Sequence, residues 1–182
     1  YDEGNLGIIN SVGYPNPGHG RDSIDGAGLP LSATVRFCPD GDYCPYDNAY
    51  WDGYRMYFGL GFASDDVTAH ELTHGVTDAT SQLIYSHESG ALNESMSDVW
   101  GEFVDLSNSG GTDTPAVRWA IAEDVPDYGP FRSMSDPTLY GDPDRYYSRY
   151  YYRGTGDSGG VHYNSGINNK LCYLLTDGDS FN

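Results

Sequence analysis

The spacing of apolar residues divides the chain into a strand-rich first part and a mainly helical second part. In residues 1–63, Gly, Pro, Asn and Asp separate short apolar runs, of which 31–37 and 54–58 have the composition of strands. A helix is predicted from Ser64 to about Thr80, because Ser64 can act as an N-cap and two acidic residues follow it in the first turn. We expect an α+β fold with a boundary between residues 63 and 64.

Two further helices are predicted in residues 64–182. One spans about 92–106, where apolar residues recur at helical spacing and are expected to face the core: Leu92, Met96, Val99, Phe103 and Leu106. The other begins near Asn164 and stops at Gly178, a residue type that often terminates helices. Residues 126–160 show little periodicity, and a long segment of this kind is usually functional or held in place by a ligand.

The net charge of the chain limits the classes of molecule that it is expected to bind. The 182 residues carry nine Lys and Arg against 27 Asp and Glu, so the formal net charge is −18. Such a chain repels phosphates, and we expect no nucleic-acid partner. No apolar run reaches the roughly 18 to 20 residues needed to cross a bilayer, so we expect no membrane partner either. Carboxylates are also the ligands that calcium prefers, although solubility alone accounts for many surface acids.

The three cysteines point to an extracellular setting. Cys38 and Cys44 enclose a turn-rich stretch that lets the two sulfur atoms meet, so we expect a disulfide and a secreted protein. Cys172 lies in an apolar run, which fits either a buried free thiol or a cysteine whose partner lies in a missing segment. The chain opens at Tyr1 without an initiator Met or a signal peptide, so we expect processed material or a fragment.

A metal-binding motif lies in the first predicted helix, at His70-Glu71-Leu72-Thr73-His74. Positions four apart on a helix differ by only about 40° around its axis, so both imidazoles project from one face. Two neutral imidazoles one turn apart can bind a zinc ion, and Glu71 flanks the same face without being a ligand. The alternative for so short a motif is a pair of surface histidines with an ordinary helical glutamate.

Acidic residues on the next predicted helix can complete this site. Glu94 follows His74 by twenty residues, and two helices joined by a short loop can pack antiparallel and bring its carboxylate to the imidazoles. Asp98, one turn later, can hold a ligating imidazole through its other ring nitrogen. His162 stands five residues after Asp157 in a glycine-rich segment, which suits an oriented hydrogen-bond donor near a reacting oxygen. The alternatives are a solvated helix face and an ordinary surface histidine.

Residues 70–98 closely resemble the zinc and third-ligand region of the thermolysin-like metallopeptidases. Other segments that resemble this family, in the same order, are DNAYWDG at 47–53, RSMSDP at 132–137, YGDPD at 140–144 and GGVHYNSGINNK at 159–170. The resemblance implies a zincin-like fold, with the active-site cleft between a β-rich N-terminal part and a mainly helical C-terminal part. It also implies that the chain is truncated at both ends, because the family's catalytic unit is longer.

The resemblance implies roles for the matching positions. The implied zinc ligands are His70, His74 and Glu94, with Asp98 supporting them. The implied catalytic groups are Glu71 as general base, Tyr85 and His162 as donors to the oxyanion, and Asp157 as the residue that orients His162. The implied contacts to the substrate backbone are Asn48, the carbonyl of Ala49, and Arg132. The implied apolar pocket for the side chain after the scissile bond is lined by Val67, Ile121, Val125 and Phe131.

Calcium is implied as a second metal, held by carboxylates at Asp66, Asp105 and Glu123. Arg118 stands where family members with two adjacent calcium ions carry an acid, so we expect one ion in this region. We therefore predict a secreted, monomeric zinc endopeptidase that cleaves protein or peptide substrates before hydrophobic residues.

Two other functions remain open. The first is a non-catalytic calcium-binding family member or fragment that acts as a binding module, and the presence of every implied catalytic group counts against it. The second is an aminopeptidase with the same metal motif, although no sequence element clearly anchors a free amino terminus.

Overall fold

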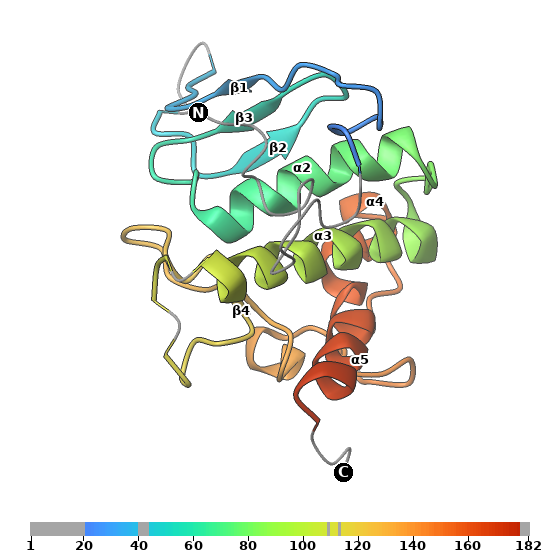
Figure 1. The fold of residues 1–182 in the computed structure, drawn as a ribbon. Coiled ribbons are helices and arrows are strands. Elements are labelled where there is room, and N and C mark those ends of the chain that lie inside the picture. The colour runs from blue at the N-terminus through green and yellow to red at the C-terminus, as the bar shows by residue number, and fades with distance from the viewer. Residues whose placement is uncertain (1–20, 40–43, 109, 113, 179–182) are drawn as a thin grey trace.

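The computed structural model describes residues 21–39, 44–108, 110–112 and 114–178, and these residues form stacked layers (Figure 1). A three-stranded sheet lies on helix α2 (Asp65–Ala79), and α2 packs against helix α3 (His87–Asn108). Helix α5 (Gly166–Thr176) lies on the side of α3 away from the sheet. The predicted α+β fold, with a β-containing part followed by a helical part, is confirmed. The boundary between residues 63 and 64 stays a prediction.

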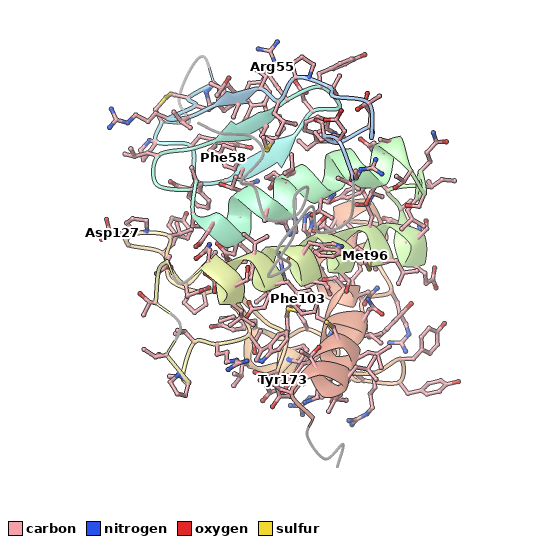
Figure 2. All side chains as sticks on the ribbon, in the orientation of Figure 1. Arg55, Phe58, Met96, Phe103, Asp127 and Tyr173 are labelled. Atoms are coloured by element: carbon pink, nitrogen blue, oxygen red, sulfur yellow. A yellow bond between two sulfur atoms is a disulfide. The ribbon has the colours of Figure 1, made fainter. Side chains whose placement is uncertain are left out.

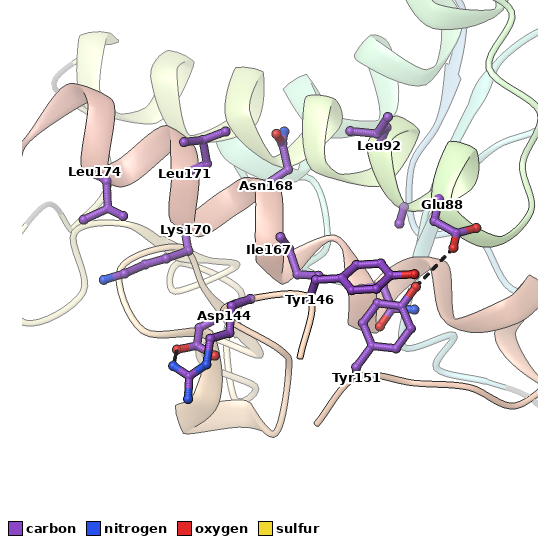
Figure 3. A pocket seen from close by; sticks show the side chains of 13 residues that line it. Glu88, Leu92, Asp144, Tyr146, Tyr151, Ile167, Asn168, Lys170, Leu171 and Leu174 are labelled. Carbon is purple, nitrogen blue, oxygen red and sulfur yellow. Dashed lines mark hydrogen bonds and ion pairs between the residues drawn. The ribbon is translucent and has the colours of Figure 1, made fainter. Parts of the chain in front are cut away.

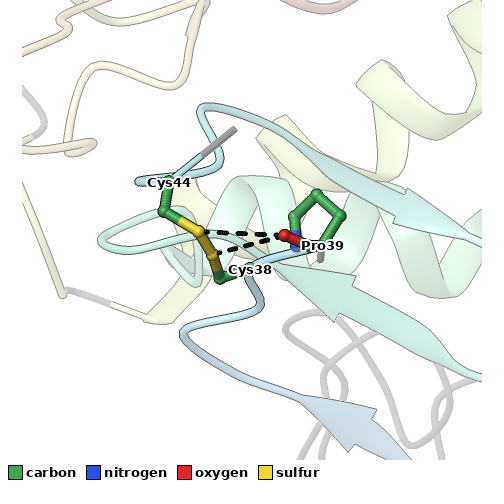
Figure 4. Close-up of a disulfide and its surroundings, with 3 residues drawn as sticks. All are labelled: Cys38, Pro39 and Cys44. Atoms are coloured by element: carbon green, nitrogen blue, oxygen red, sulfur yellow. Dashed lines mark hydrogen bonds between the residues drawn. A yellow bond between two sulfur atoms is a disulfide. The ribbon is translucent and has the colours of Figure 1, made fainter. Parts of the chain in front are cut away.

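The sheet consists of β1 (Ala33–Thr34), β2 (Ala49–Trp51) and β3 (Met56–Phe58) in the order β1-β3-β2. β1 pairs with β3 in parallel, and β2 pairs with β3 antiparallel. The first and third strands fall inside the predicted runs but are shorter, and β2 was not predicted. Phe58 is buried on the side of β3 that faces α2 (Figure 2). The expected disulfide joins Cys38 to Cys44 in the segment between β1 and β2 (Figure 4).

Helix α2 has almost the predicted bounds, but its first turn is built differently. The hydroxyl of Ser64 does not cap a backbone N–H group and instead donates to Oδ1 of Asp66 at 2.6 Å. Oδ1 of Asp66 also accepts from the N–H of Val67 at 2.6 Å. The acidic side chain therefore does the capping that the sequence assigned to the serine.

Helix α3 begins at His87, five residues before the predicted start, and it buries only part of the expected face. Val99 is buried, and Phe103 and Leu106 pack against the hydrophobic core, as predicted. Leu92 and Met96 are 44% and 38% exposed, so the prediction that they face the core was wrong. The buried residues of α3 are mostly small or polar: Gly90, Ala91, Asn93, Glu94, Ser95, Ser97, Asp98, Val99, Gly101, Glu102, Val104 and Asp105. Gly101 lets the helices approach closely, since a Cβ there would lie 2.8 Å from the carbonyl oxygen of Asp66. The seam between α2 and α3 is therefore largely polar.

The segment after α3 contains little regular structure, as predicted. It includes a two-stranded antiparallel ladder of β4 (Ala120–Ile121) and β5 (Arg132–Ser133), and a 3-10 helix η2 at Pro137–Tyr140. Helix α4 (Asp157–Asn164) was not predicted. Helix α5 lies inside the predicted range, and Gly178 follows it with a φ of 67°.

Aromatic rings join α5 to α3. Trp119 contacts both Phe103 and Tyr173, with ring centroids 6.3 and 5.6 Å away. Cys172 is a free thiol and only partly buried. Part of the apolar face of α5 lines an open groove of about 560 Å³ together with Leu92 (Figure 3). Among the described residues, no helix is long and apolar enough to span a bilayer.

Candidate metal centre and active-site cleft

Three side chains from α2 and α3 converge at the centre of the candidate site. Nε2 of His70 lies 3.1 Å from Nε2 of His74, and each nitrogen lies 3.4 Å from a carboxylate oxygen of Glu94. One ligand atom from each residue falls within 4.8 Å of the other two. The histidines meet because they stand four apart on α2, and Glu94 reaches them because α3 runs antiparallel to α2 (Figure 1).

The spacing of these atoms fits a zinc ion. Two zinc–nitrogen bonds of about 2.0 to 2.1 Å at a tetrahedral angle separate their nitrogens by about 3.3 Å, close to the distances found here. His70 and Glu94 are 7% and 1% exposed, and within the described part of the chain the buried Oε2 of Glu94 has no hydrogen-bond partner. Three protein ligands leave a fourth position for water or substrate, which is typical of catalytic rather than structural zinc sites.

Asp98 contacts the other side of the His70 ring. Its Oδ1 lies 2.9 Å from Nδ1 of His70, so Nε2 is the nitrogen that faces His74 and Glu94. Although burial opposes a charged imidazole, Asp98 and Glu94 raise the pKa of His70 to about 10. The surroundings therefore favour a positive charge at this point, and a bound cation satisfies that preference.

Asn93 makes a contact that sequence reasoning missed. Its Oδ1 lies 2.8 Å from Nδ1 of His74, and Oγ of Ser97 lies 3.3 Å from the same nitrogen. With Nε2 facing Glu94, Nδ1 carries the proton and donates it to Asn93. Neighbouring positions on a helix point about 100° apart, so the sequence alone did not indicate that Asn93 and Glu94 both reach α2.

Glu71 lies beside these residues and lines the same cleft. Burial raises the pKa of its carboxyl above the ordinary value, although His70 and His74 act in the opposite direction. A carboxylate with a raised pKa accepts a proton more readily near neutral pH. The position and environment of Glu71 therefore suit a general base.

Tyr85 and His162 approach Glu94 from outside α2. The Tyr85 hydroxyl donates to Oε1 of Glu94, and Nε2 of His162 lies 3.2 Å from that hydroxyl and 3.4 Å from Oε1. Burial and the charge of Glu94 raise the pKa of Tyr85, so its hydroxyl stays protonated at neutral pH. Both side chains can therefore donate to an oxygen that becomes negative at this place.

A left-handed turn at the start of α4 presents His162 to the site. Residues 157–160 all have positive φ angles, from 49° to 90°. The last two are glycines, and a Cβ on Gly160 would lie 2.5 Å from the Tyr152 side chain. The turn brings the Asp157 carboxylate to within 2.6 Å of Nδ1 of His162, and it also accepts from the backbone N–H of His162 at 3.0 Å. Asp157 therefore holds His162 at two points.

These groups open into a cleft of about 520 Å³. The cleft is lined by most of the residues predicted to contact substrate: Asn48, Ala49, Val67, Ile121, Phe131 and Arg132. Val125 is not among the lining residues, because its side chain is buried in the hydrophobic core. Trp51 and Asp78 also line the cleft and were not predicted; Nε1 of Trp51 donates to Oδ2 of Asp78 at 2.9 Å.

A second group of carboxylates lies where α2 begins and α3 ends. Oxygens of Asp65, Asp105 and Asp124 fall within 4.8 Å of one another. Asp105 is the member that the sequence predicted, whereas Asp66 uses its oxygens for hydrogen bonds around the start of α2. Glu123 lies nearby, and burial and the charge of Asp66 raise the pKa of its carboxyl to about 7, so a second negative charge at Glu123 is unfavourable without a cation.

Comparison with known families and proteins gives consistent matches. Residues 8–78 match the thermolysin metallopeptidase catalytic domain, and residues 81–182 match the thermolysin metallopeptidase alpha-helical domain. A zinc metalloproteinase of Renibacterium salmoninarum is 49% identical over 173 residues, which are 90% of this chain and 31% of that protein. Bacillolysin of Bacillus cereus is 47% identical over 172 residues, 87% of this chain and 28% of that protein.

Two further relatives extend this result. Thermolysin of Alicyclobacillus acidocaldarius is 45% identical over 174 residues, 88% of this chain and 29% of that protein. Among solved structures, the precursor of protealysin, a metalloproteinase of Serratia proteamaculans, is 37% identical with a TM-score of 0.69. That alignment covers 85% of this chain and 52% of the protealysin chain. The chain thus spans less than a third of the length of the relatives matched by sequence.

Proposed function

The chain belongs to the thermolysin metallopeptidase family, and we propose that it forms the zinc-binding part of a secreted endopeptidase that hydrolyses peptide bonds in protein or peptide substrates. The observation that carries this proposal is the convergence of His70, His74 and Glu94 beside Glu71, in a cleft of about 520 Å³. Secretion is supported by the Cys38–Cys44 disulfide, a bond typical of oxidising compartments.

In the proposed mechanism, His70, His74 and Glu94 would hold a zinc ion, which when bound would supply Lewis-acid chemistry by lowering the pKa of water to about 7 and polarising the peptide carbonyl. Glu71 accepts the proton of the attacking water and delivers it to the amine that leaves. Its buried position strengthens it as a base, since the pKa of its carboxyl is raised. The reaction is therefore a hydrolysis that needs no covalent intermediate on the protein.

Tyr85 and His162 act on the oxyanion of the tetrahedral intermediate. Both donors stand beside Oε1 of Glu94, and Asp157 fixes the ring of His162 through Nδ1. Donors that are already in place when charge develops are worth more than donors that must reorganise. Arg132 and Asn48 line the cleft where they can bind the backbone of the substrate.

A peptidase assay with and without a chelator tests the proposal directly. The chain should hydrolyse a peptide, lose this activity with a zinc chelator and regain it when zinc is added back. A chain that binds zinc but cleaves nothing would favour the alternative, a non-catalytic binding module. We propose a monomer, which gel filtration of the same sample checks.

Cleavage should occur before Leu, Phe, Ile or Val. Val67, Ile121 and Phe131 give this part of the cleft no charge to pair with a polar side chain, and burying an unpaired polar group is unfavourable. Each buried methylene contributes about 0.8 kcal/mol, so Leu should exceed Ala by at least about an order of magnitude in kcat/KM. A cleavage map of a peptide library, read by mass spectrometry, checks this. Cleavage mainly before Lys, Arg or Asp would contradict the pocket assignment.

We also propose that one calcium ion binds the second group of carboxylates. Asp105 lies within reach of both Asp65 and Asp124, and Asp66 and Glu123 add negative charge nearby. Calcium accepts six to eight oxygen ligands, so such a group suits it better than magnesium, which requires a regular octahedron. Asp65 and Asp66 open the helix that carries His70 and His74, so this ion would also steady the zinc site.

Millimolar calcium should raise the melting temperature of the chain. An ion that binds only the folded form at a hundredfold excess over its Kd contributes about 2.7 kcal/mol, or about 5 to 10 °C for a domain of this size. Asp105→Asn should abolish this response, whereas Asp127→Asn removes an exposed acid and should not. Differential scanning fluorimetry measures the effect. A wild-type melting temperature that ignores calcium would mean that these acids are only a solvated surface.

The same acids should give the calcium-free chain a distinctive pH dependence. Glu123 releases its proton near pH 4.5 when unfolded but holds it until about pH 7 when folded. The folded state then binds more protons within this window, so the free energy of unfolding should fall as the pH rises from about 4.5 to 7. Calcium should reduce that slope, which equilibrium unfolding in urea at several pH values would measure.

A further inference from the structure

The Asp98 carboxylate is held by donors from three elements. Arg132 of β5 donates from Nη2 to Oδ1 at 2.5 Å and from Nε to Oδ2 at 2.9 Å. His70 of α2 places Nδ1 2.9 Å from Oδ1. Asn169 of α5 donates from Nδ2 to Oδ2 at 2.8 Å. Asp98 and Asn169 are 0% and 1% exposed, so water does not compete for these bonds.

We propose that Asn169 is a positioning residue for the metal centre, which acts by fixing Asp98 and through it His70. The residue does not touch the metal position and belongs to a helix that contributes no predicted ligand. The inference rests on the proposed zinc site. It adds α5 to the elements that determine how tightly this site holds its metal.

The orientation of Asn169 is itself determined by α3. Oδ1 of Asn169 accepts a hydrogen bond from Oγ of Ser95 at 2.6 Å, and Ser95 is fully buried. With its oxygen turned to Ser95, the amide must direct Nδ2 to Asp98. Oγ of Ser95 in turn accepts from Nδ2 of Asn168 at 2.9 Å. The bonds therefore form a continuous path from Ser95 through Asn169 and Asp98 to His70, and Asn168 contacts only its outer end.

The path matters because a ligating imidazole must point its free nitrogen accurately at the metal. Asp98 sets the ring of His70, and the hydrogen bonds on Oδ2 keep Oδ1 turned toward Nδ1. Partners of this kind typically change metal affinity by about 10- to 100-fold when they are removed. A buried hydrogen-bond network also resists reorientation. Loss of Asn169 should therefore lower the affinity for zinc although every ligand is still present.

The test is the zinc dissociation constant of the 182-residue chain, measured by competition with a chromogenic chelator. Direct partners of a ligand are worth about 10- to 100-fold, and Asn169 acts one residue further out, so Asn169→Ala should weaken zinc binding by about tenfold. Asn168→Ala removes the same group from the neighbouring position and a bond to Ser95 but none to Asp98, so it should leave zinc affinity unchanged. Ser95→Ala should weaken binding in the same direction but less, and it decides the question if Asn169→Ala does not fold.

One outcome of this test would overturn the inference. If Asn169→Ala lowers the melting temperature but binds zinc as tightly as the wild type, Asn169 only ties α5 to α3 and the inference is wrong. A wild-type chain that binds no zinc would instead overturn the proposed function, and this inference with it. The absorption spectrum of the cobalt-substituted chain gives a second readout, since altered ligand geometry should shift the bands in Asn169→Ala but not in Asn168→Ala.

Discussion

Replacing Glu71 with glutamine should lower the turnover of peptide hydrolysis by about 10² to 10⁴-fold while zinc stays bound. The amide keeps the shape of the side chain but cannot accept a proton from water. Glu71 lies beside the candidate ligands without being one of them, so metal content should not change. Steady-state kinetics on a peptide substrate, together with zinc analysis of the dialysed protein, measure both quantities. Near-normal turnover would show that another group is the base.

Replacing Glu94 with glutamine is the matched experiment. Here we expect zinc itself to be lost, whereas Glu71→Gln should keep it. The same carboxylate-to-amide change removes a charged ligand, so the chain should lose most of its zinc after dialysis and its activity with it. Glu94 is the better test of the metal site because its carboxylate contacts both imidazoles. Its pKa lies well below the ordinary value, since the neighbouring imidazoles outweigh the effect of burial.

The two variants separate the two proposed roles. Circular dichroism should show that both variants keep the helical content of the wild type, because neither substitution changes side-chain volume appreciably. If Glu94→Gln retains stoichiometric zinc and Glu71→Gln loses it, the roles of the two carboxylates are exchanged. If both variants retain zinc, the ion is held elsewhere and the proposed centre is wrong.

Local spacing was sufficient to predict the centre of the site. His70 and His74 share a face because of helical periodicity, and a short loop after α2 requires an antiparallel α3 that brings Glu94 close. These features depend on residues near one another in the chain. The proximity of His162 to Tyr85, in contrast, was implied by family resemblance. Tyr85 lies 77 positions earlier in the chain, and no local rule relates two residues so far apart.

Periodicity revealed only part of the buried face of α3. The stripe that starts at Leu92 satisfies the usual rule for a core-facing helix, yet Leu92 and Met96 are exposed and only its later part, from Val99 on, reaches the core. The opposite stripe is buried because it faces α2, where its polar groups have partners such as His70 and His74. Such partners come from other segments of the chain, and for this reason the roles of Asn93 and Asn169 were also invisible in the sequence.

The polar seam between α2 and α3 determines which assays would detect a separation of these two helices. In most helical proteins, separation of two packed helices uncovers an apolar surface that binds hydrophobic dyes and promotes aggregation. Separation here would uncover Asn, Ser and carboxylate groups instead. These groups hydrate well, and the carboxylates among them repel those of other molecules. Loss of order at the metal centre would therefore expose mainly polar surface along this seam, so zinc content should report such damage more directly than dye binding.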